Sequence, residues 1–453
     1  MTTEQDNEKR IIGLSVTTGV GATNLYSYYV ACMIAIMMAT FLPQSQAFIL
    51  TEYLKIPESE QGVVSGDLNF WGEIVIIATV GLFGAMSDRV GRRIVMALGF
   101  AIMGIAFYLY PRATDVGELL AFRLIYSAGI AAVSCMIVTV VADYVKNVSR
   151  GKASGYLGVM NGLGAMIAAF VLIKLPAKFI ANGMSPLDAG ITTFSIVMGI
   201  AFATAILMWV GLKKHVPEAH EDRPSLGRMI VDGVKAAKDP GIALAYGASF
   251  VARGNLAVVG TFLALWLTTY GTTELGMTAA DALSKAGMVI GISYMAAFLG
   301  APLFGLLTDK VERTTALMIT LAVAFVGYGG TFFVADPFSG LMIAFMILVG
   351  LSEVGCIITS GVLIAQQSPE RLRGSIIGIF NLTGAIGILV ASKVGGYLFD
   401  NWSPSGPFAI FGIFALIVLI WALLVRRRVT PVDPGAGKDH GLDEQAQESA
   451  AYS

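Results

Sequence analysis

The chain has 453 residues, of which 56% are hydrophobic and only 13% are charged, and its net charge is -1. That charged share is about half the share found in soluble globular proteins, and a soluble core cannot bury so much apolar surface. The composition therefore excludes an ordinary soluble domain. The sequence also contains no polybasic domain of the kind that binds nucleic acid.

Apolar runs of close to twenty residues or more follow one another along most of the chain. A run of about 20 apolar residues is long enough to cross the hydrocarbon core of a bilayer as a helix. The sequence thus predicts an all-α membrane protein whose twelve transmembrane helices form two pseudo-symmetric bundles of six. We place the spans at residues 25–50, 62–83, 94–111, 116–143, 152–174, 189–212, 241–270, 283–307, 315–335, 338–366, 374–399 and 406–425.

The longest internal polar stretch divides the spans six and six. We expect this stretch to be a linker, with a regulatory role as the alternative, and Leu226 to Val234 fit an amphipathic helix at the membrane surface. The predicted regions are a cytoplasmic tail at 1–24, an N-terminal bundle at 25–212, a cytoplasmic linker at 213–240, a C-terminal bundle at 241–426 and a disordered cytoplasmic tail at 427–453.

The basic residues predict the orientation. With the N-terminus inside, 22 Lys and Arg residues fall in cytoplasmic segments and four fall outside. An excess of basic residues marks cytoplasmic loops, so both termini are expected in the cytoplasm, in a multi-pass protein of the cell membrane.

A charged loop between the second and third spans occurs again, in a degraded form, between the eighth and ninth. The first copy contains Gly84, Asp88, Arg89, Gly91, Arg92 and Arg93. The second copy keeps Gly305, Asp309, Lys310 and Arg313 but has Glu312 in place of the second glycine. A further element follows span ten and contains Pro369, Glu370, Arg373 and Gly374.

These motifs, in a six-plus-six topology, resemble the major facilitator superfamily over about residues 25–426. The resemblance implies a carrier whose two bundles rock about a central site. It also implies that Asp88 caps the start of span eleven near Gly374 and that Arg92 pairs with Asp143 at the inner end of span four. Such contacts would form only with the cytoplasmic side closed. The alternative is that the basic residues of the loop only determine topology.

Seven ionisable residues lie inside the predicted spans. A charge at mid-bilayer costs at least ~2.5–3.5 kcal/mol, so these side chains should face a cavity or one another. Lys174 is near enough to the outer end of its span to snorkel, and Lys393 either snorkels or lines a cavity. The others are Asp67, Glu73, Arg123, Arg253 and Glu353.

Arg123 shares one helical face with Ser127, and such a polar stripe predicts a water-filled cavity. Asp67 or Glu73 is its expected partner, and the family resemblance implies a part in proton coupling. In the second half, Arg253 and Glu353 carry opposite charges at mid-span, so we expect them to meet. A static buried ion pair is the alternative reading for both.

The prediction that follows is a monomeric secondary transporter that takes up a small organic anion together with protons. Its alternatives are a proton-driven exporter of amphiphilic compounds and a non-transporting sensor on a carrier fold. The sequence contains no phosphate-binding Gly-x4-Gly-Lys-Ser/Thr motif, and its three histidines all lie outside the spans. We therefore expect no enzymatic activity, no metal site and no cofactor, with the substrate, protons and lipid as the partners.

Overall fold

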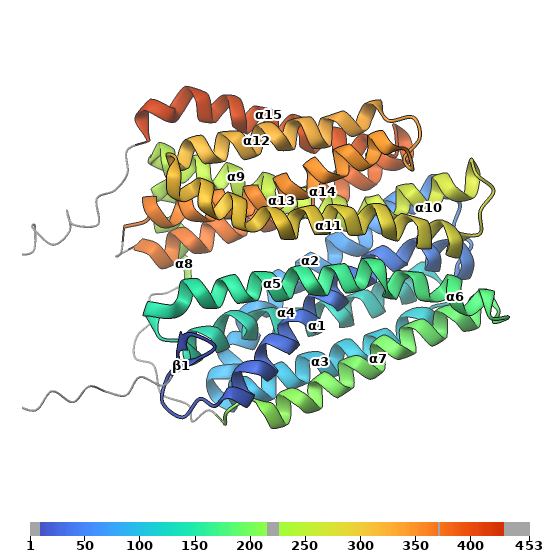
Figure 1. Ribbon diagram of the computed structural model, residues 1–453, viewed down its shortest axis with the longest axis horizontal. Helices are drawn as coiled ribbons and strands as arrows, with labels where there is room; N and C mark the ends of the chain where they lie inside the picture. The colour runs from blue at the N-terminus through green and yellow to red at the C-terminus, as the bar shows by residue number, and fades with distance from the viewer. Residues whose placement is uncertain (1–9, 215–225, 370–371, 430–453) are drawn as a thin grey trace, which may run out of the picture.

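The computed structural model describes residues 10–214, 226–369 and 372–429. Figure 1 shows two stacked bundles of long helices, the N-terminal one in blue to green and the C-terminal one in yellow to red. Twelve of the described helical segments, from Ala22–Tyr53 to Gly406–Arg428, are long and apolar enough to cross a membrane. Each coincides with a predicted span, which confirms the twelve-helix fold.

The N-terminal bundle contains α1 (Ala22–Phe48, continued by a π-helical turn at Ile49–Tyr53), α2 (Glu58–Val90), α3 (Arg92–Leu109), α4 (Val116–Tyr144), α5 (Arg150–Phe170), the short α6 (Leu175–Ala181) and α7 (Pro186–Gly211). A linker helix, α8 (Leu226–Lys235), comes next. The C-terminal bundle contains α9 (Pro240–Val258), a π-helical turn (Val259–Leu263), α10 (Ala264–Thr273), α11 (Ala279–Lys310), α12 (Arg313–Gly330), α13 (Gly340–Gln367), α14 (Arg373–Asn401) and α15 (Gly406–Val425). Short 3-10 turns lie at Tyr110–Arg112, Asn147–Ser149, Leu172–Lys174, Ala236–Lys238, Thr331–Phe333 and Arg426–Arg428.

Polar caps explain where several of these helices begin. The first backbone N–H groups of a helix have no partner within the helix, and a Ser, Thr or Asp side chain just before it accepts from them. Asp115 caps α4, Ser185 caps α7, Asp239 caps α9, Thr278 caps α11 and Ser339 caps α13. Each cap ends a polar loop and starts an apolar run, so local sequence sets these boundaries.

The N-terminal segment is more ordered than the predicted tail at 1–24. Strands β1 (Arg10–Ile11) and β2 (Leu14–Ser15) form a hairpin whose turn residues, Ile12 and Gly13, both have positive φ. Leu14 is fully buried. Apolar side chains in a mixed-charge stretch thus anchor residues 10–15 to the bundle. Hydropathy averaged over the length of a membrane span does not detect so short a buried segment.

Within the linker, the predicted amphipathic helix is present as α8. It packs on α14, where the backbone at Gly233 lies against Ser375 and Ile379, and Tyr246 donates a hydrogen bond to the Gly233 carbonyl at 2.9 Å. Its location at the membrane surface stays a prediction. Residues 215–225 and the predicted tail beyond residue 429 lie outside the described residues.

The two bundles touch through paired helices, α2 with α14 and α5 with α11. We call the end that carries residues 84–93 and 305–313 the motif end, and the opposite end the far end. The first and last described residues lie at the motif end with α8 (Figure 1). Small residues allow the helices to approach closely, because no side chain separates the two backbones.

Three pairs of glycines show where the bundles are in contact. The members of each pair are 18 residues apart, which is five helical turns, about 27 Å, on one face of a helix. Towards the far end, a Cβ at Gly66 would overlap the Ser392 carbonyl, one at Gly396 would lie 2.6 Å from the Gly62 carbonyl oxygen and one at Gly287 would lie 2.5 Å from that of Ala169.

Towards the motif end the same faces are open. A Cβ at Gly378 or Gly305 would meet no atom within 4 Å, and one at Gly84 would meet only Cys135 of its own bundle. These three glycines are the second members of the 18-residue pairs: Gly378 is paired with Gly396, Gly305 with Gly287, and Gly84 with Gly66. The bundles are therefore closed against each other at the far end and separated at the motif end.

Candidate functional site

Charged side chains from both bundles meet near the middle of the long helices. Glu73 lies halfway along α2, and it interacts electrostatically with Arg253 of α9 and with Arg123 of α4. Arg123 donates a hydrogen bond to the Asn69 side chain, and Arg253 donates one to Asn381 at 3.0 Å. We call Glu73, Arg123 and Arg253 the central charged site.

Glycines make room for both arginines. A Cβ at Gly72 would lie 2.7 Å from the Ser127 hydroxyl and 3.5 Å from Nε of Arg123. At Gly384 of α14, a Cβ would lie 2.8 Å from Nε of Arg253. Each guanidinium group thus lies against a bare stretch of backbone on the neighbouring helix.

The central charged site has spare hydrogen-bonding capacity and a net charge of +1 when all three groups are ionised. Nε and Nη1 of Arg123 are buried and have no hydrogen-bond partner, while its guanidinium carbon lies 5.5 Å from the centroid of the Tyr126 ring. Buried donors without partners are costly, so an anionic ligand that accepts from them would be stabilised. Among the described residues, no group of three or more His, Cys, Asp or Glu side chains is placed to hold a metal ion.

Of the two partners expected for Arg123, Glu73 interacts with it electrostatically and Asp67 does not, and the expected meeting of Arg253 with Glu353 is wrong. Asp67 does not reach Arg123 but forms an ion pair with Lys393 of α14 at 2.5 Å. Six helical positions separate Asp67 from Glu73, which turns the two carboxylates about 120° apart on α2. Only the Glu73 carboxylate can therefore face the arginines.

Glu353 is likewise apart from Arg253. Its side chain is buried inside the C-terminal bundle, Oε2 has no hydrogen-bond partner, and the ionisable neighbours that feel its charge are Tyr294 and Tyr328. Arg253 instead faces the space between the bundles, where Glu73 of the other bundle supplies the opposite charge. The sequence identified the charged residues and Glu73 as a partner of Arg123, but it paired Arg253 with Glu353 of its own half instead of with Glu73 of the other half.

Polar contacts fasten the bundles together on the far-end side. Besides the Asp67–Lys393 ion pair, the Asp400 carboxylate accepts from the backbone N–H groups of Gly62 and Val63 at 2.8 and 2.7 Å. We call these contacts the far-end clasp. Asp400 was missed in the sequence, and its one signal was its place as an acidic residue at the outer end of a predicted span.

Two more hydrogen bonds join the bundles. Gln44 of α1 donates to the Tyr294 hydroxyl at 2.8 Å, and Asn69 donates to the Thr261 hydroxyl. Asn69 therefore connects Arg123 to the C-terminal bundle. It could have been found from its position one turn before Glu73, on the same face of α2.

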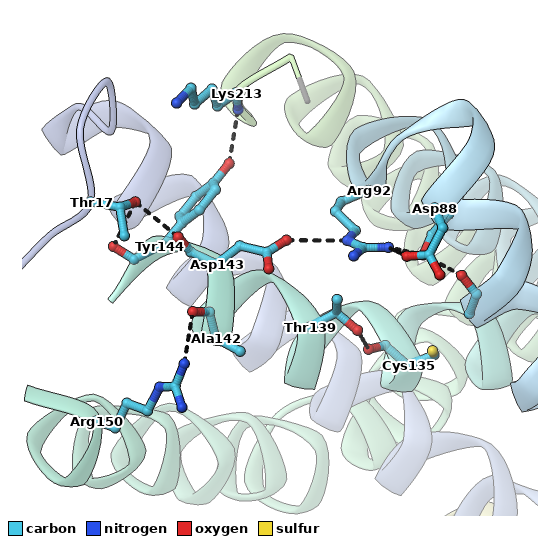
Figure 2. A network of polar contacts seen from close by, with 12 residues as sticks. Thr17, Asp88, Arg92, Cys135, Thr139, Ala142, Asp143, Tyr144, Arg150 and Lys213 are labelled. Carbon is cyan, nitrogen blue, oxygen red and sulfur yellow. Dashed lines mark hydrogen bonds and ion pairs between the residues drawn. The ribbon is translucent and has the colours of Figure 1, made fainter. Parts of the chain in front are cut away.

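At the motif end, Arg92 lies at the centre of a polar network (Figure 2). Its Nε donates to Asp143 at 3.1 Å and its Nη1 to Asp88 at 2.5 Å. The predicted pairing of Arg92 with Asp143 is therefore present. Thr17 of the N-terminal segment donates to the Asp143 carbonyl at 2.8 Å, which fastens that segment to the same network.

The expectation that this pair forms only with the cytoplasmic side closed stays a prediction, although the contact itself lies within one bundle. Arg92 and Asp143 both belong to the N-terminal bundle, and they are paired here although the motif end is open. A contact within one rigid bundle does not have to break when the bundles separate. The contact of Asp88 with the start of span eleven near Gly374 stays a prediction. Glu370 lies outside the described residues.

Gly91 makes the turn that directs Arg92 back towards Asp88. Its φ of 94° and ψ of 148° lie in a region that L-residues hardly occupy.

We expect Gly91→Ala to lose about 1–3 kcal/mol of stability, from the strain of this conformation. Thermal unfolding of the purified protein would check this, with Gly151→Ala as the control, because a Cβ at Gly151 meets no atom within 4 Å. Equal melting temperatures for the two variants would contradict the assignment.

The second copy of the motif is built differently. Glu312, in place of glycine, has a φ of -55° and pairs with Arg426 of the last helical turn at 3.3 Å. Arg313 retains a buried Nε without a hydrogen-bond partner. The other predicted residues at this end, namely Arg89, Asp309, Lys310 and Arg373, have exposed side chains. Where Glu312 replaces the second glycine of the motif, the described residues of this half thus show no network like the one that joins Arg92 to Asp88 and Asp143.

Comparison with known proteins identifies the family. A family model described as Major Facilitator Superfamily matches residues 27–392 and, in a second match, residues 282–449. The chain belongs to the major facilitator superfamily. It is therefore a multi-pass membrane protein of a transporter family, and the predicted family and fold are confirmed.

Relatives in this superfamily differ in their described roles. The chain is 27% identical over 429 residues to the magnetosome protein MamH of Paramagnetospirillum magneticum, covering 93% of this chain and 95% of the relative. It is 28% identical to magnetosome protein MamZ of the same organism over 87% of this chain, but spans only 61% of that longer protein. A multidrug resistance protein, MdtG of Yersinia enterocolitica, is 23% identical over 88% of this chain and 91% of its own length.

The solved structure of the nucleoside transporter NupG has a similar fold. Its TM-score is 0.67 at 14% sequence identity, over 89% of this chain and 98% of NupG. At that identity the likeness supports the superfamily fold and carries no information about the substrate.

Proposed function

We propose that this superfamily member is a secondary transporter that takes up a small organic anion together with protons by alternating access. The observation that carries the proposal is the central charged site, in which one carboxylate interacts electrostatically with arginines from both bundles. An arrangement that joins the two moving parts at mid-membrane can couple a ligand to their motion.

Competition between Glu73 and the substrate provides the coupling. While Glu73 is ionised, it partly neutralises Arg123 and Arg253 and weakens the site for an anion. Protonation removes that charge, so both arginines can bind a substrate carboxylate or phosphate. Because linkage is reciprocal, a bound anion raises the affinity of Glu73 for a proton to the same extent, and the two load and leave together.

The gate is formed by the helix faces of α2, α11 and α14 that carry the paired glycines. In this structure the far end is closed and the motif end is open, a state suited to release at the motif end, which we assign to the cytoplasm from the basic residues. The opposite state requires the far-end clasp to open and the faces at Gly84, Gly305 and Gly378 to meet. Each chain contains both bundles, so a monomer is sufficient.

A proton-driven exporter is the second candidate, and the multidrug resistance relatives favour it. An exporter would use the same exchange at Glu73, with the substrate and the proton in competition instead of in cooperation. A sensor that binds a ligand without moving it is a third possibility.

Reconstituted vesicles test the three functions. With an imposed gradient, inside alkaline, we expect accumulation of a radiolabelled organic anion, chosen by a thermal-shift screen of small carboxylates and phosphates. A protonophore should abolish the accumulation. Net movement of an amphiphilic cation against the proton flow would support the exporter, and saturable binding without flux of any compound would support the sensor.

A further inference from the structure

A groove on the membrane-facing side of the N-terminal bundle lies apart from the central charged site. It runs between α3 and α7, whose closest helix neighbours all belong to the N-terminal bundle. Its volume is about 410 Å³, and its lining is apolar. The lining includes Ile94, Leu98 and Ala101 of α3 and Phe202, Ile206 and Trp209 of α7.

The shape of the groove follows from helix periodicity. On each helix the lining residues occupy positions i, i+4 and i+7, so they form a stripe about 10 Å long. Their surface is accessible, with Leu98 42% and Ile206 66% exposed. In a bilayer such a stripe is in contact with lipid chains, since no polar group lines it that would hold water.

A cation lies at the motif end of this groove. The guanidinium carbon of Arg93 is 4.7 Å from the centroid of the Trp209 ring. Arg93 makes no ion pair within the part of the chain that the structure describes, unlike Arg92, which turns into the bundle towards Asp143. Consecutive residues on a helix point about 100° apart, so these two arginines cannot share one partner. Arg93 belongs to the predicted charged loop, and its side chain lies at the end of this groove.

We propose that the groove between α3 and α7 binds an anionic phospholipid, with an acyl chain along the apolar stripe and the phosphate on Arg93. Tryptophan and arginine side chains at the end of a span are suited to the headgroup layer, the first with an amphipathic ring and the second with a bidentate phosphate donor. The apolar stripe excludes free phosphate as the natural ligand. This lipid site is independent of whether the protein carries an anion.

Quenching by brominated lipids tests the site in the full-length protein in vesicles. The contribution of Trp209 is the difference between the parent protein and Trp209→Phe. We expect dibrominated phosphatidylglycerol to quench Trp209 with about fivefold higher apparent affinity than dibrominated phosphatidylcholine, because one basic residue near a membrane surface has about that effect. Equal affinities for the two lipids would overturn the proposal.

Three variants identify the group responsible. Arg93→Gln should remove the preference for phosphatidylglycerol, and Arg93→Lys should retain most of it. Arg427→Gln removes the same charge from the same end of the other bundle, where the side chain is exposed, and should leave the preference intact. A preference that persists in Arg93→Gln, or one that is lost equally in Arg427→Gln, would exclude Arg93 as the headgroup ligand.

Discussion

Glu73→Gln is expected to reduce proton-driven accumulation strongly while leaving exchange of labelled for unlabelled substrate across the membrane. Glutamine resembles the protonated carboxylic acid, so both arginines stay free to bind the anion whatever the pH. Coupling free energies between sites are about 1–3 kcal/mol, so the accumulation ratio should fall about 5–150-fold. Uptake and exchange measured on the same vesicles would separate the two activities.

A matched control lies on the same helix. Glu60 is exposed near the far end of α2, away from the arginines, and Glu60→Gln should accumulate substrate as the parent protein does. Loss of exchange in Glu73→Gln would indicate that the carboxylate is needed to hold the substrate site together. Proton-driven accumulation at the parent level in Glu73→Gln would exclude Glu73 as the coupling group.

Gly66→Val is expected to keep the far end from closing. The new Cβ would overlap the Ser392 carbonyl. The overlapping atoms belong to the backbone, so no flexible side chain can move away to relieve the clash. Overpacking of this kind costs about 1–3 kcal/mol, which shifts a two-state equilibrium about 5–150-fold towards the state without the contact. Transport should therefore slow, and the motif-end-open state described here should become rare.

Spin labels across the far end would measure the shift. Lys55 and Glu274 are exposed there on opposite bundles, and cysteines at these positions, in a chain without its three native cysteines, report the separation. The closed and open states of the far end should give a shorter and a longer distance between the two labels. We expect the longer distance to dominate in Gly66→Val. The control is Gly81→Val on the same helix, since a Cβ at Gly81 meets no atom within 4 Å. An unchanged distance distribution in Gly66→Val would contradict the closed-contact interpretation.

The central charged site shows the limit of prediction from sequence. Glu73, Arg123 and Arg253 were identified because charges are rare inside a span and need compensation. The partner of Arg253 was not identified, because helical spacing relates residues on one helix and gives no information about which face of a distant helix lies opposite. Glu353 was therefore assigned to Arg253 in place of Glu73.

Spans, helix starts and the two-halved architecture follow from local properties of the chain. A bilayer imposes a length on every apolar run, and polar N-caps set where several of the helices begin, so hydropathy is sufficient to predict the twelve helices. The Arg92–Asp143 pair was also predictable, because a family motif specifies both of its members.

Packing decided the rest. The state of the gate and the far-end clasp depend on how the two bundles lie against each other. The clasp joins residues more than 300 positions apart, such as Asp67 and Lys393, and no local pattern in the chain encodes their register.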